Sequence, residues 1–439
     1  MVFNNLLRRI KIMYNKEDMD YTTGIVDPME FHKLFFFFVK SFGVYDGPLP
    51  KWATHIFLFL RFRTPLFVFE YVLICLGIFL DLVAASHYFP EMDIVNMVQI
   101  MSYCIILLYK LFVLSTIKGD LPHYHNLIKS MREDFLYACT EGQRYRARFF
   151  KLQLETWMLS VRIISFMNFL TISMSSLSAV LLIFLQILNL MGYETEKIIL
   201  IPFWAPGIDF KKSPVYEISF AYFIVVIALY GVSYSFMVQV QFQWIRQITI
   251  KCDMITFALQ DVLENIHITT DPREKAILNY ILRQRMRSII HQHQSMFRLL
   301  DDFAGVYKKY HIYEKLNCST LVCVTTYATV EKLSVGEFHI ILTFMCVAIV
   351  SVMFIPNYLC DYLGMKIRSI CDVCAEVPIW NVSGKVLRPY FLLMMQRSLR
   401  PLPLRATGFK DTCLETFGSN MASAYTMFNM IRQTAIEIK

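Results

Sequence analysis

The stretch Val215–Val240 reads VYEISFAYFIVVIALYGVSYSFMVQV and contains one charged residue, Glu217. An α-helix needs about 20 predominantly apolar residues to cross about 30 Å of hydrocarbon. Val215–Val240 is long enough and apolar enough to do so. It therefore predicts a membrane-spanning helix.

The same test finds further candidate spans on both sides of this stretch. His311–Leu333 is the weaker of them, and Asp411–Ala435 is the least hydrophobic. With Val215–Val240 they make seven spans and predict one all-α polytopic membrane domain over residues 1–439. The other six are Thr64–His87, Ile94–Ile117, Met158–Met191, His311–Leu333, Gly336–Cys360 and Asp411–Ala435.

The composition supports a membrane protein. Charged residues make up 18% of the chain, against roughly a quarter in soluble domains, and the mean hydropathy is +0.44. The net charge of +8 comes from short basic clusters between the apolar stretches. These clusters lack interleaved aromatic residues, so no nucleic-acid partner is expected.

The basic residues predict the orientation of the spans. Lys and Arg gather in the N-terminal arm and in the segments after the second, fourth and sixth spans, whereas Tyr88–Asp93 has none. Because basic loops stay in the cytosol, the N-terminus is predicted to be cytosolic. With seven spans the C-terminus is then extracellular.

Helical periodicity continues outside the spans. Gln241–Tyr310 and the segment 386–400 repeat apolar residues at helical spacing and predict one intracellular helical bundle. Near the N-terminus, Phe31–Val44 reads FHKLFFFFVKSFGV and is too short to span. It suits either a helix in the membrane interface or a helix packed on the bundle.

No residue pattern indicates an enzyme. The chain lacks nucleophile-elbow, phosphate-loop and zinc-protease motifs. The pair Cys371 and Cys374 has no second pair nearby to complete a zinc site, so reduced structural thiols are expected. His291 and His293 are expected on a solvated helix face. No metal or cofactor is therefore expected.

Few charged residues fall inside the predicted spans. Lys110 and Arg162 lie toward the predicted cytosolic ends, where long side chains can reach the headgroups. Asp81 and Glu217 lie near span ends. Ion-coupled transporters usually keep acidic residues in the membrane interior, so the sequence gives little support to a coupled transporter.

The last span, Asp411–Ala435, carries two stripes at helical spacing. One stripe is small and polar, and the other is bulky. A small polar stripe can pack against another helix or line a wet pore. One helix cannot enclose a pore, so the second use requires an oligomer. The small stripe is Ser419, Ser423, Thr426, Met430 and Thr434, and the bulky stripe is Phe417, Met421, Tyr425 and Phe428.

The C-terminal segment resembles the signature of insect odorant receptors. The similarity rests on MQRSLRPLPLRATGF (Met395–Phe409), LETF (Leu414–Phe417) and SAYTMF (Ser423–Phe428). The chain departs from the family pattern at Leu399, where Gln is usual, and at Thr407, where Gly is usual.

This resemblance implies a function in odour detection. Such receptors are subunits of odorant-gated, non-selective cation channels in the plasma membrane of sensory neurons, and each forms a heterotetramer with a shared co-receptor. The last helix lines the pore, with the hydrophobic gate at Met430 and Thr434 one turn further out. This chain lacks the extended intracellular loop of the co-receptor, so the resemblance implies the odorant-tuning subunit.

A ligand pocket is expected among the second, third, fourth and sixth spans. Methionine and aromatic walls with few hydroxyls suit a small volatile odorant or pheromone, although the same residues also suit ordinary core packing. The candidates from helix geometry and the resemblance are Met97, Met101, Cys104, Met174, Ser175, Ser178, Phe220, Phe223, Ile224, Tyr327 and Thr343.

Two other chemoreceptor classes remain as alternatives. A G-protein-coupled chemoreceptor needs an external N-terminus, which the basic N-terminal arm disfavours. A gustatory-type ligand-gated channel has a similar architecture. Gustatory receptors usually end on a T-Y-x5-Q-F-like motif, which the last span does not contain.

Overall fold

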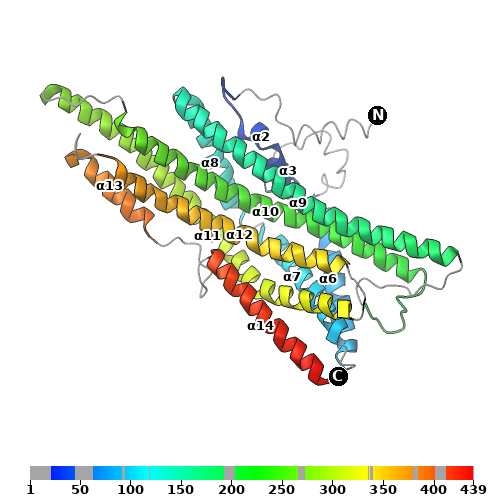
Figure 1. Ribbon diagram of the computed structural model, residues 1–439. Helices are drawn as coiled ribbons and strands as arrows, with labels where there is room; N and C mark the ends of the chain where they lie inside the picture. Colours follow the sequence, from blue (N-terminus) through cyan, green and yellow to red (C-terminus); the bar gives the residue numbers. More distant parts are fainter. Residues whose placement is uncertain are drawn as a thin grey trace.

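The computed structural model describes residues 21–44, 63–90, 94–117, 119–191, 203–264, 272–334, 336, 340–378, 384–400 and 412–438. Every named element in these ranges is a helix (Figure 1). The elements are α2 (Pro28–Phe31), α3 (Lys33–Ser41), α6 (Arg63–Tyr88), α7 (Ile94–Ile117), α8 (Leu121–Thr140), α9 (Gln143–Leu190), α10 (Val215–Gln260), η1 (Asp261–Leu263), α11 (Pro272–Ser334), α12 (Ile340–Glu376), α13 (Gly384–Ser398) and α14 (Leu414–Ile438).

Three helices are much longer than a membrane is thick. α9, α10 and α11 contain 48, 46 and 63 residues, which at 1.5 Å per residue gives about 70, 70 and 95 Å. The predicted spans Met158–Met191, Val215–Val240 and His311–Leu333 are therefore parts of longer rods. Figure 1 shows these rods running side by side through the molecule.

Within the described ranges, five helices are long and apolar enough to cross a membrane. The two remaining predicted spans fall at the end of α11 and on α14, and they are the least hydrophobic of the seven predicted spans. Both are helical in the structure. The count of seven spans and the orientation of the termini stay predictions. The five candidates are Glu70–Tyr88, Asn96–Ile117, Gln143–Leu188, Val215–Leu263 and Leu342–Glu376.

The helices expected inside the cell pack into one large hydrophobic cluster. It joins parts of α3, α8, α10, α11, α12 and α13. Trp244 of α10 is fully buried there, and its indole nitrogen donates a hydrogen bond to the Leu299 carbonyl at 3.1 Å. The rings of Tyr124 and Phe303 lie 5.7 and 5.8 Å from the Trp244 ring. These contacts hold α8, α10 and α11 together.

Several polar side chains in this core pair with groups on neighbouring helices. On α10, Gln239 donates to Ser160 at 2.6 Å and Gln247 pairs with Gln153 at 3.0 Å. The Lys251 ammonium lies 2.5 Å from the Asp134 carboxylate. Because an unpaired buried polar group costs free energy, these pairs fix the register of α10 against α8 and α9.

The N-terminal aromatic run packs on the bundle. Phe31, Phe35, Phe36 and Val39 are each no more than 2% exposed, and the His32 ring lies 2.8 Å from the Gln153 side chain. Of the two alternatives for this run, the structure shows the packed helix.

Two sequence expectations about charged or polar residues are wrong. Lys110 does not reach out of the protein: it is 2% exposed and forms a 2.5 Å ion pair with Glu70 of α6. His293 is not on a solvated face, because it is 5% exposed and contacts Ser398 of α13 at 3.3 Å. In both cases the partner lies on another helix. His291 and Arg162 are exposed, as expected.

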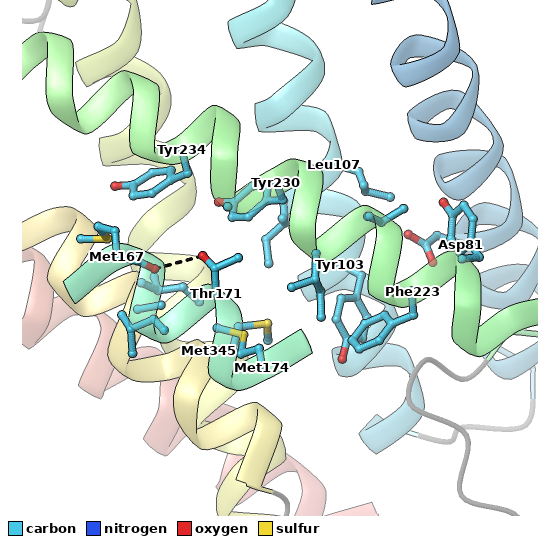
Figure 2. A pocket seen from close by; sticks show the side chains of 18 of the residues that line it. Asp81, Tyr103, Leu107, Met167, Thr171, Met174, Phe223, Tyr230, Tyr234 and Met345 are labelled. Carbon is cyan, nitrogen blue, oxygen red and sulfur yellow. Dashed lines mark hydrogen bonds between the residues drawn. The ribbon is translucent and has the colours of Figure 1, made fainter. Parts of the chain in front are cut away.

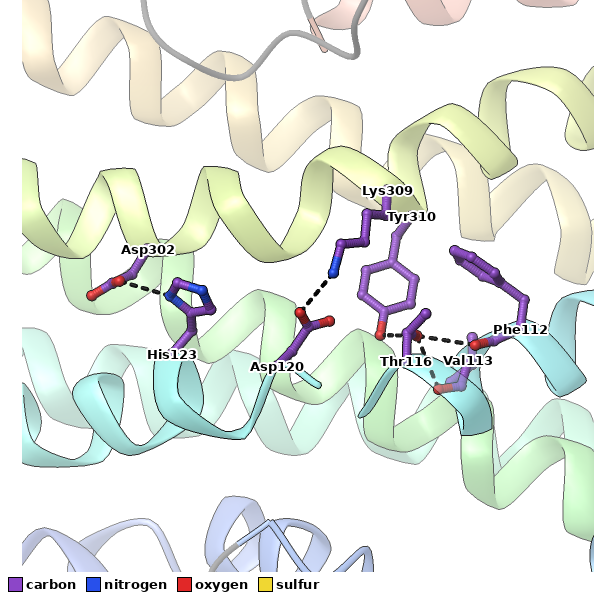
Figure 3. Close-up of polar contacts among 8 residues, drawn as sticks. All are labelled: Phe112, Val113, Thr116, Asp120, His123, Asp302, Lys309 and Tyr310. Carbon is purple, nitrogen blue, oxygen red and sulfur yellow. Dashed lines mark hydrogen bonds and ion pairs between the residues drawn. The ribbon is translucent and has the colours of Figure 1, made fainter. Parts of the chain in front are cut away.

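A polar cluster joins α7 and α8 to α11 (Figure 3). The Thr116 hydroxyl lies 2.7 Å from the Tyr310 hydroxyl, and the Lys309 ammonium lies 2.9 Å from the Asp120 carboxylate. His123 contacts Asp302 at 2.8 Å. These polar contacts therefore hold the turn between α7 and α8 against α11.

Candidate functional site

A cavity lies between α6, α7, α9, α10 and α12 (Figure 2). The space open to the centre of a water-sized sphere is about 120 Å³. The lining residues are Asp81, Tyr103, Ile106, Leu107, Met167, Leu170, Thr171, Met174, Phe203, Tyr222, Phe223, Val226, Ile227, Tyr230, Gly231, Tyr234, Met345, Ala348 and Ile349. The volume is close to that of an engineered cavity of about 150 Å³ that binds benzene, so a ligand of that order fits.

The helical repeat explains which side chains meet at the cavity. On α10, Phe223, Ile227, Tyr230 and Tyr234 recur at steps of three and four and thus share one face. On α9, Met167 and Met174 are two turns apart and share another face. Aromatic and thioether groups therefore form most of the wall. Such walls bind apolar molecules by burying area and adapt to irregular shapes.

The hydroxyl groups in the wall have defined partners. The Thr171 hydroxyl donates to the Met167 carbonyl at 3.0 Å, and the Tyr222 hydroxyl donates to the Leu73 carbonyl at 3.0 Å. The second bond ties α10 to α6 beside the cavity. These groups add little free hydrogen-bonding capacity, so the wall is apolar in character.

At Gly231, beside the cavity, α10 lies close to α9. A Cβ atom placed on Gly231 would overlap the Thr171 side chain. A glycine is therefore required there unless Thr171 moves. Ser175 lines a second and more open hollow between α9 and α10, which shares Thr171 and Gly231 with the cavity.

The cavity contains two of the eleven predicted ligand residues, Met174 and Phe223. The four helices expected to supply a pocket all contribute to it, and α6 contributes as well. Most of the other candidates lie in packed or half-buried positions near the cavity. Phe220 and Tyr327 are 2% exposed inside a hydrophobic cluster, and Met101 is 44% exposed on the outside.

The remaining candidates do not line the cavity either. Ser178 is buried and donates to the Met174 carbonyl at 2.8 Å. The half-buried candidates are Met97, Cys104, Ile224 and Thr343.

Several residues that line the cavity are not among the ligand residues predicted from the sequence. The repeat from Phe223 to Tyr234 lies on one face of α10 and can be recognised in the sequence, where it extends the candidates by about three turns. Helical spacing does not predict Asp81 as a cavity residue, because its neighbours in sequence place it near a span end. The structure puts it in the cavity wall at 1% exposure.

The small polar stripe of α14 contacts no other described helix closely enough to be buried in the single chain. All five of its residues are exposed, and Met430 is 62% exposed. The hydroxyls of Ser423, Thr426 and Thr434 bond to carbonyls one turn earlier on the same helix. Three of the four hydroxyls in the stripe are therefore satisfied within the helix, and the fifth side chain is a thioether.

The opposite face of α14 packs against the protein. Phe417, Met421 and Phe428 contact the cluster that includes residues of α11 and α12, and the Phe417 ring lies 5.5 Å from that of Phe354. Tyr425 departs from the predicted bulky stripe, since it is 67% exposed. The reason is its neighbour Ala424, which is 2% exposed and takes the buried position.

The described residues therefore form a helical protein with several candidate membrane spans and a cavity with a mainly apolar wall. Residues 92–425 match the model of the family described as 7tm odorant receptor. This match covers most of the chain, and the chain belongs to the odorant receptor family. A comparison with curated protein sequences gives no match.

Solved structures show the same fold. The chain is similar to the insect olfactory receptor OR5 from Machilis hrabei in complex with eugenol, with a TM-score of 0.64 and 14% identity over 92% of this chain and 97% of that chain. A second structure of the same receptor, OR5 from Machilis hrabei, gives a TM-score of 0.61 and 13% identity over 92% of this chain and 100% of that chain.

Proposed function

We propose that the protein is the odorant-tuning subunit of an odorant-gated, non-selective cation channel. It assembles with a co-receptor subunit into a heterotetramer in the plasma membrane of sensory neurons. A small volatile molecule binds in the cavity between α6, α7, α9, α10 and α12, and α14 contributes to the shared pore. The family is one of receptors and channels, which supports a role without catalysis.

The observation that carries the proposal is the cavity itself. Its walls combine three methionines with six aromatic residues, and its volume of about 120 Å³ suits a molecule near the size of benzene. A volatile molecule has few polar groups and gains binding free energy mainly by leaving water. The eugenol complex of the similar receptor adds support for a ligand of this class.

The pore assignment is supported by the exposed stripe of α14. Small hydroxyl side chains that stay exposed in the single chain suit a surface that faces water inside an oligomer. Met430 is the bulkiest member of the stripe, so it would form the apolar ring that closes the path. The packed face of α14 would transmit movements of α11 and α12.

A chain of contacts links the cavity to α14. Tyr313 of α11 donates a hydrogen bond to the Ile105 carbonyl of α7 at 3.2 Å, beside the cavity residue Ile106. The Tyr313 ring also stacks on Phe112 at 5.3 Å. α11 in turn packs against α14. A ligand that binds the open arrangement more tightly would shift the gate through these helices.

The experiment is whole-cell current recording in a heterologous cell with a broad odorant panel. Three conditions are compared while G-protein signalling is blocked: this chain alone, the co-receptor alone, and both together. The expected result is a fast cation current only with both. A response that vanishes under the block would contradict the proposal and favour a G-protein-coupled mechanism.

A further inference from the structure

Asp81 is the one charged residue among the described residues that line the cavity. It lies on α6, is 1% exposed, and has no hydrogen-bond partner for either carboxyl oxygen within the described part of the chain. Figure 2 shows its carboxyl at one end of the cavity and Met167, Met174 and Met345 toward the other. The cavity is thus polar at one end and apolar at the other.

Other buried acidic residues in the described ranges have cationic partners. Glu70 pairs with Lys110 at 2.5 Å, and Asp120 pairs with Lys309 at 2.9 Å. A buried carboxylate without a partner costs several kcal/mol. Without a protein partner, the Asp81 carboxyl therefore either holds a proton or takes a cationic group from a bound molecule.

The surroundings of Asp81 favour a cationic partner. Among the described residues, the titratable groups that interact with it are Tyr103 and Cys104 on α7 and Tyr222 on α10. None of them carries a positive charge, and the Tyr222 hydroxyl already donates to the Leu73 carbonyl. The aromatic rings of Tyr103 and Phe223 lie 6.0 Å apart at 89° in the same wall. Aromatic faces and a carboxylate both attract an ammonium group.

We infer that the cavity binds a small organic amine, with its ammonium group at Asp81 and its apolar body toward the methionines. This inference rests on the proposed function and names the chemical class of the ligand. The amine satisfies the carboxylate with a charge-assisted hydrogen bond, and the alkyl or aryl body fills the space near Met174 and Met345. Asp81 is then the residue that separates amines from neutral odorants of the same shape.

The test compares matched ligands on the full chain expressed with the co-receptor. The pairs are hexylamine with hexanol, and benzylamine with benzyl alcohol, each applied near neutral pH. In the wild type, the amine of each pair is expected to act at a concentration at least about tenfold lower, which is the lower range for a hydrogen bond to a charged group. Asp81→Asn should remove that advantage, so that the amine of each pair acts at no lower concentration than its alcohol.

Asp209→Asn is the matched control. Asp209 is exposed in the segment before α10, pairs with Lys212 at 3.7 Å and does not line the cavity, so the substitution removes the same charge outside the cavity wall. Labelling of the receptor at the cell surface checks that each variant is made. Equal potency of amine and alcohol in the wild type overturns the inference, and so does an equal change of both in Asp81→Asn.

A binding measurement separates this inference from the proposed function. Benzylamine should raise the thermal unfolding midpoint of the purified chain in detergent, and Asp81→Asn should abolish that rise. If the chain binds the amine through Asp81 but gives no current, the channel proposal fails and the amine site stands. If neutral odorants evoke the current and stabilise the protein while amines do neither, the amine site fails and the channel proposal stands.

Discussion

The two halves of α10 differ in the kinds of side chain that they bury and expose. In the half that begins at Val215, buried Tyr216, Phe220 and Phe223 alternate with exposed Ile218 and Val225. From Ser233 to Cys252 every residue is buried, including four glutamines, one arginine and one lysine. One half of the helix therefore exposes apolar side chains, and the other buries polar ones.

The difference follows from what surrounds each half. An apolar side chain that faces lipid loses nothing, so exposed isoleucine and valine are stable where α10 crosses the hydrocarbon. The second half is enclosed by other helices, so its polar groups can find hydrogen-bond partners only inside the protein. The cavity lies on the first half, where packing is incomplete, while the second half forms a closely packed support.

The largest expected effect is in the second half. Burial raises the pKa of the Asp134 carboxyl, and the neighbouring Lys251 lowers it. Lys251→Met leaves that carboxylate buried without its counter-charge, which should lower the free energy of unfolding by about 3–5 kcal/mol. Thermal unfolding in detergent measures the loss.

The double variant Lys251→Met with Asp134→Asn should recover most of this stability, because no unpaired charge remains. Val225→Ala on the exposed side of the first half is the control and should change stability by no more than about 0.5 kcal/mol. If the single variant is as stable as the wild type, the two halves do not differ as described.

A smaller effect is expected at the cavity. Gly231→Ala places a Cβ against Thr171, and overpacking of this kind costs about 1–3 kcal/mol. Odorant potency should fall by about tenfold, as measured by the concentration for half-maximal current, because the wall shifts into the cavity. Thr171→Ala in the same chain should restore part of the response.

Gly142→Ala is the matched control for this substitution. A Cβ on Gly142 meets no atom within 4 Å, so potency should not change. Unaltered potency in Gly231→Ala would contradict the assignment of the cavity as the ligand site.

A third prediction concerns pH and the bundle. Burial, followed by the charge of Arg397, lowers the pKa of His293 to about 4. Unfolded histidine binds a proton below about pH 6.5, so between these values the unfolded chain holds more protons. Stability should therefore fall as the pH drops below about 6.5, by up to about 1.4 kcal/mol per pH unit.

His293→Gln should remove this part of the pH dependence, as measured by thermal unfolding between neutral pH and pH about 5. His291→Gln is the control, because His291 is exposed on the same helix. An identical pH dependence in both variants would show that His293 is not buried as the structure has it.

The smallest effect on stability is expected at the exposed stripe of α14. Met430→Ala should change the free energy of unfolding by no more than about 0.5 kcal/mol, yet raise the current without odorant or shift the open probability. Whole-cell recording with the co-receptor measures both. Met427→Ala, three residues earlier, should leave the gate unchanged. If Met430→Ala has unaltered conductance and gating, α14 does not form the gate or the co-receptor sets it alone.

Much of the helical architecture was predictable from hydropathy and spacing. The apolar runs located α6, α7 and the membrane parts of α9, α10 and α12, because about 20 apolar residues in sequence have few other uses. The faces of α10 and α14 were predictable in part, and Met174 and Phe223 entered the candidate site in this way. Tyr425 shows the limit of such patterns, since the small Ala424 took the buried position instead.

The pairing of charged residues was not predictable. Lys110 and Glu70 lie on different helices, and their contact depends on the rotation and offset of α6 against α7. A periodic pattern gives the relative positions of residues on one helix but not the angle at which two helices meet. The same limit hid Asp81, whose place in the cavity follows from the contact of α6 with α7 and α10.

The sequence by itself determined that the chain is helical, where its apolar runs lie, and which family it resembles, because these follow from composition, local periodicity and a short C-terminal motif. Only the tertiary structure decided which side chains share the cavity, which buried charges have partners, and which face of α14 stays uncovered. The physical reason is that packing between helices sets these relations, and packing depends on side chains that are far apart in the chain.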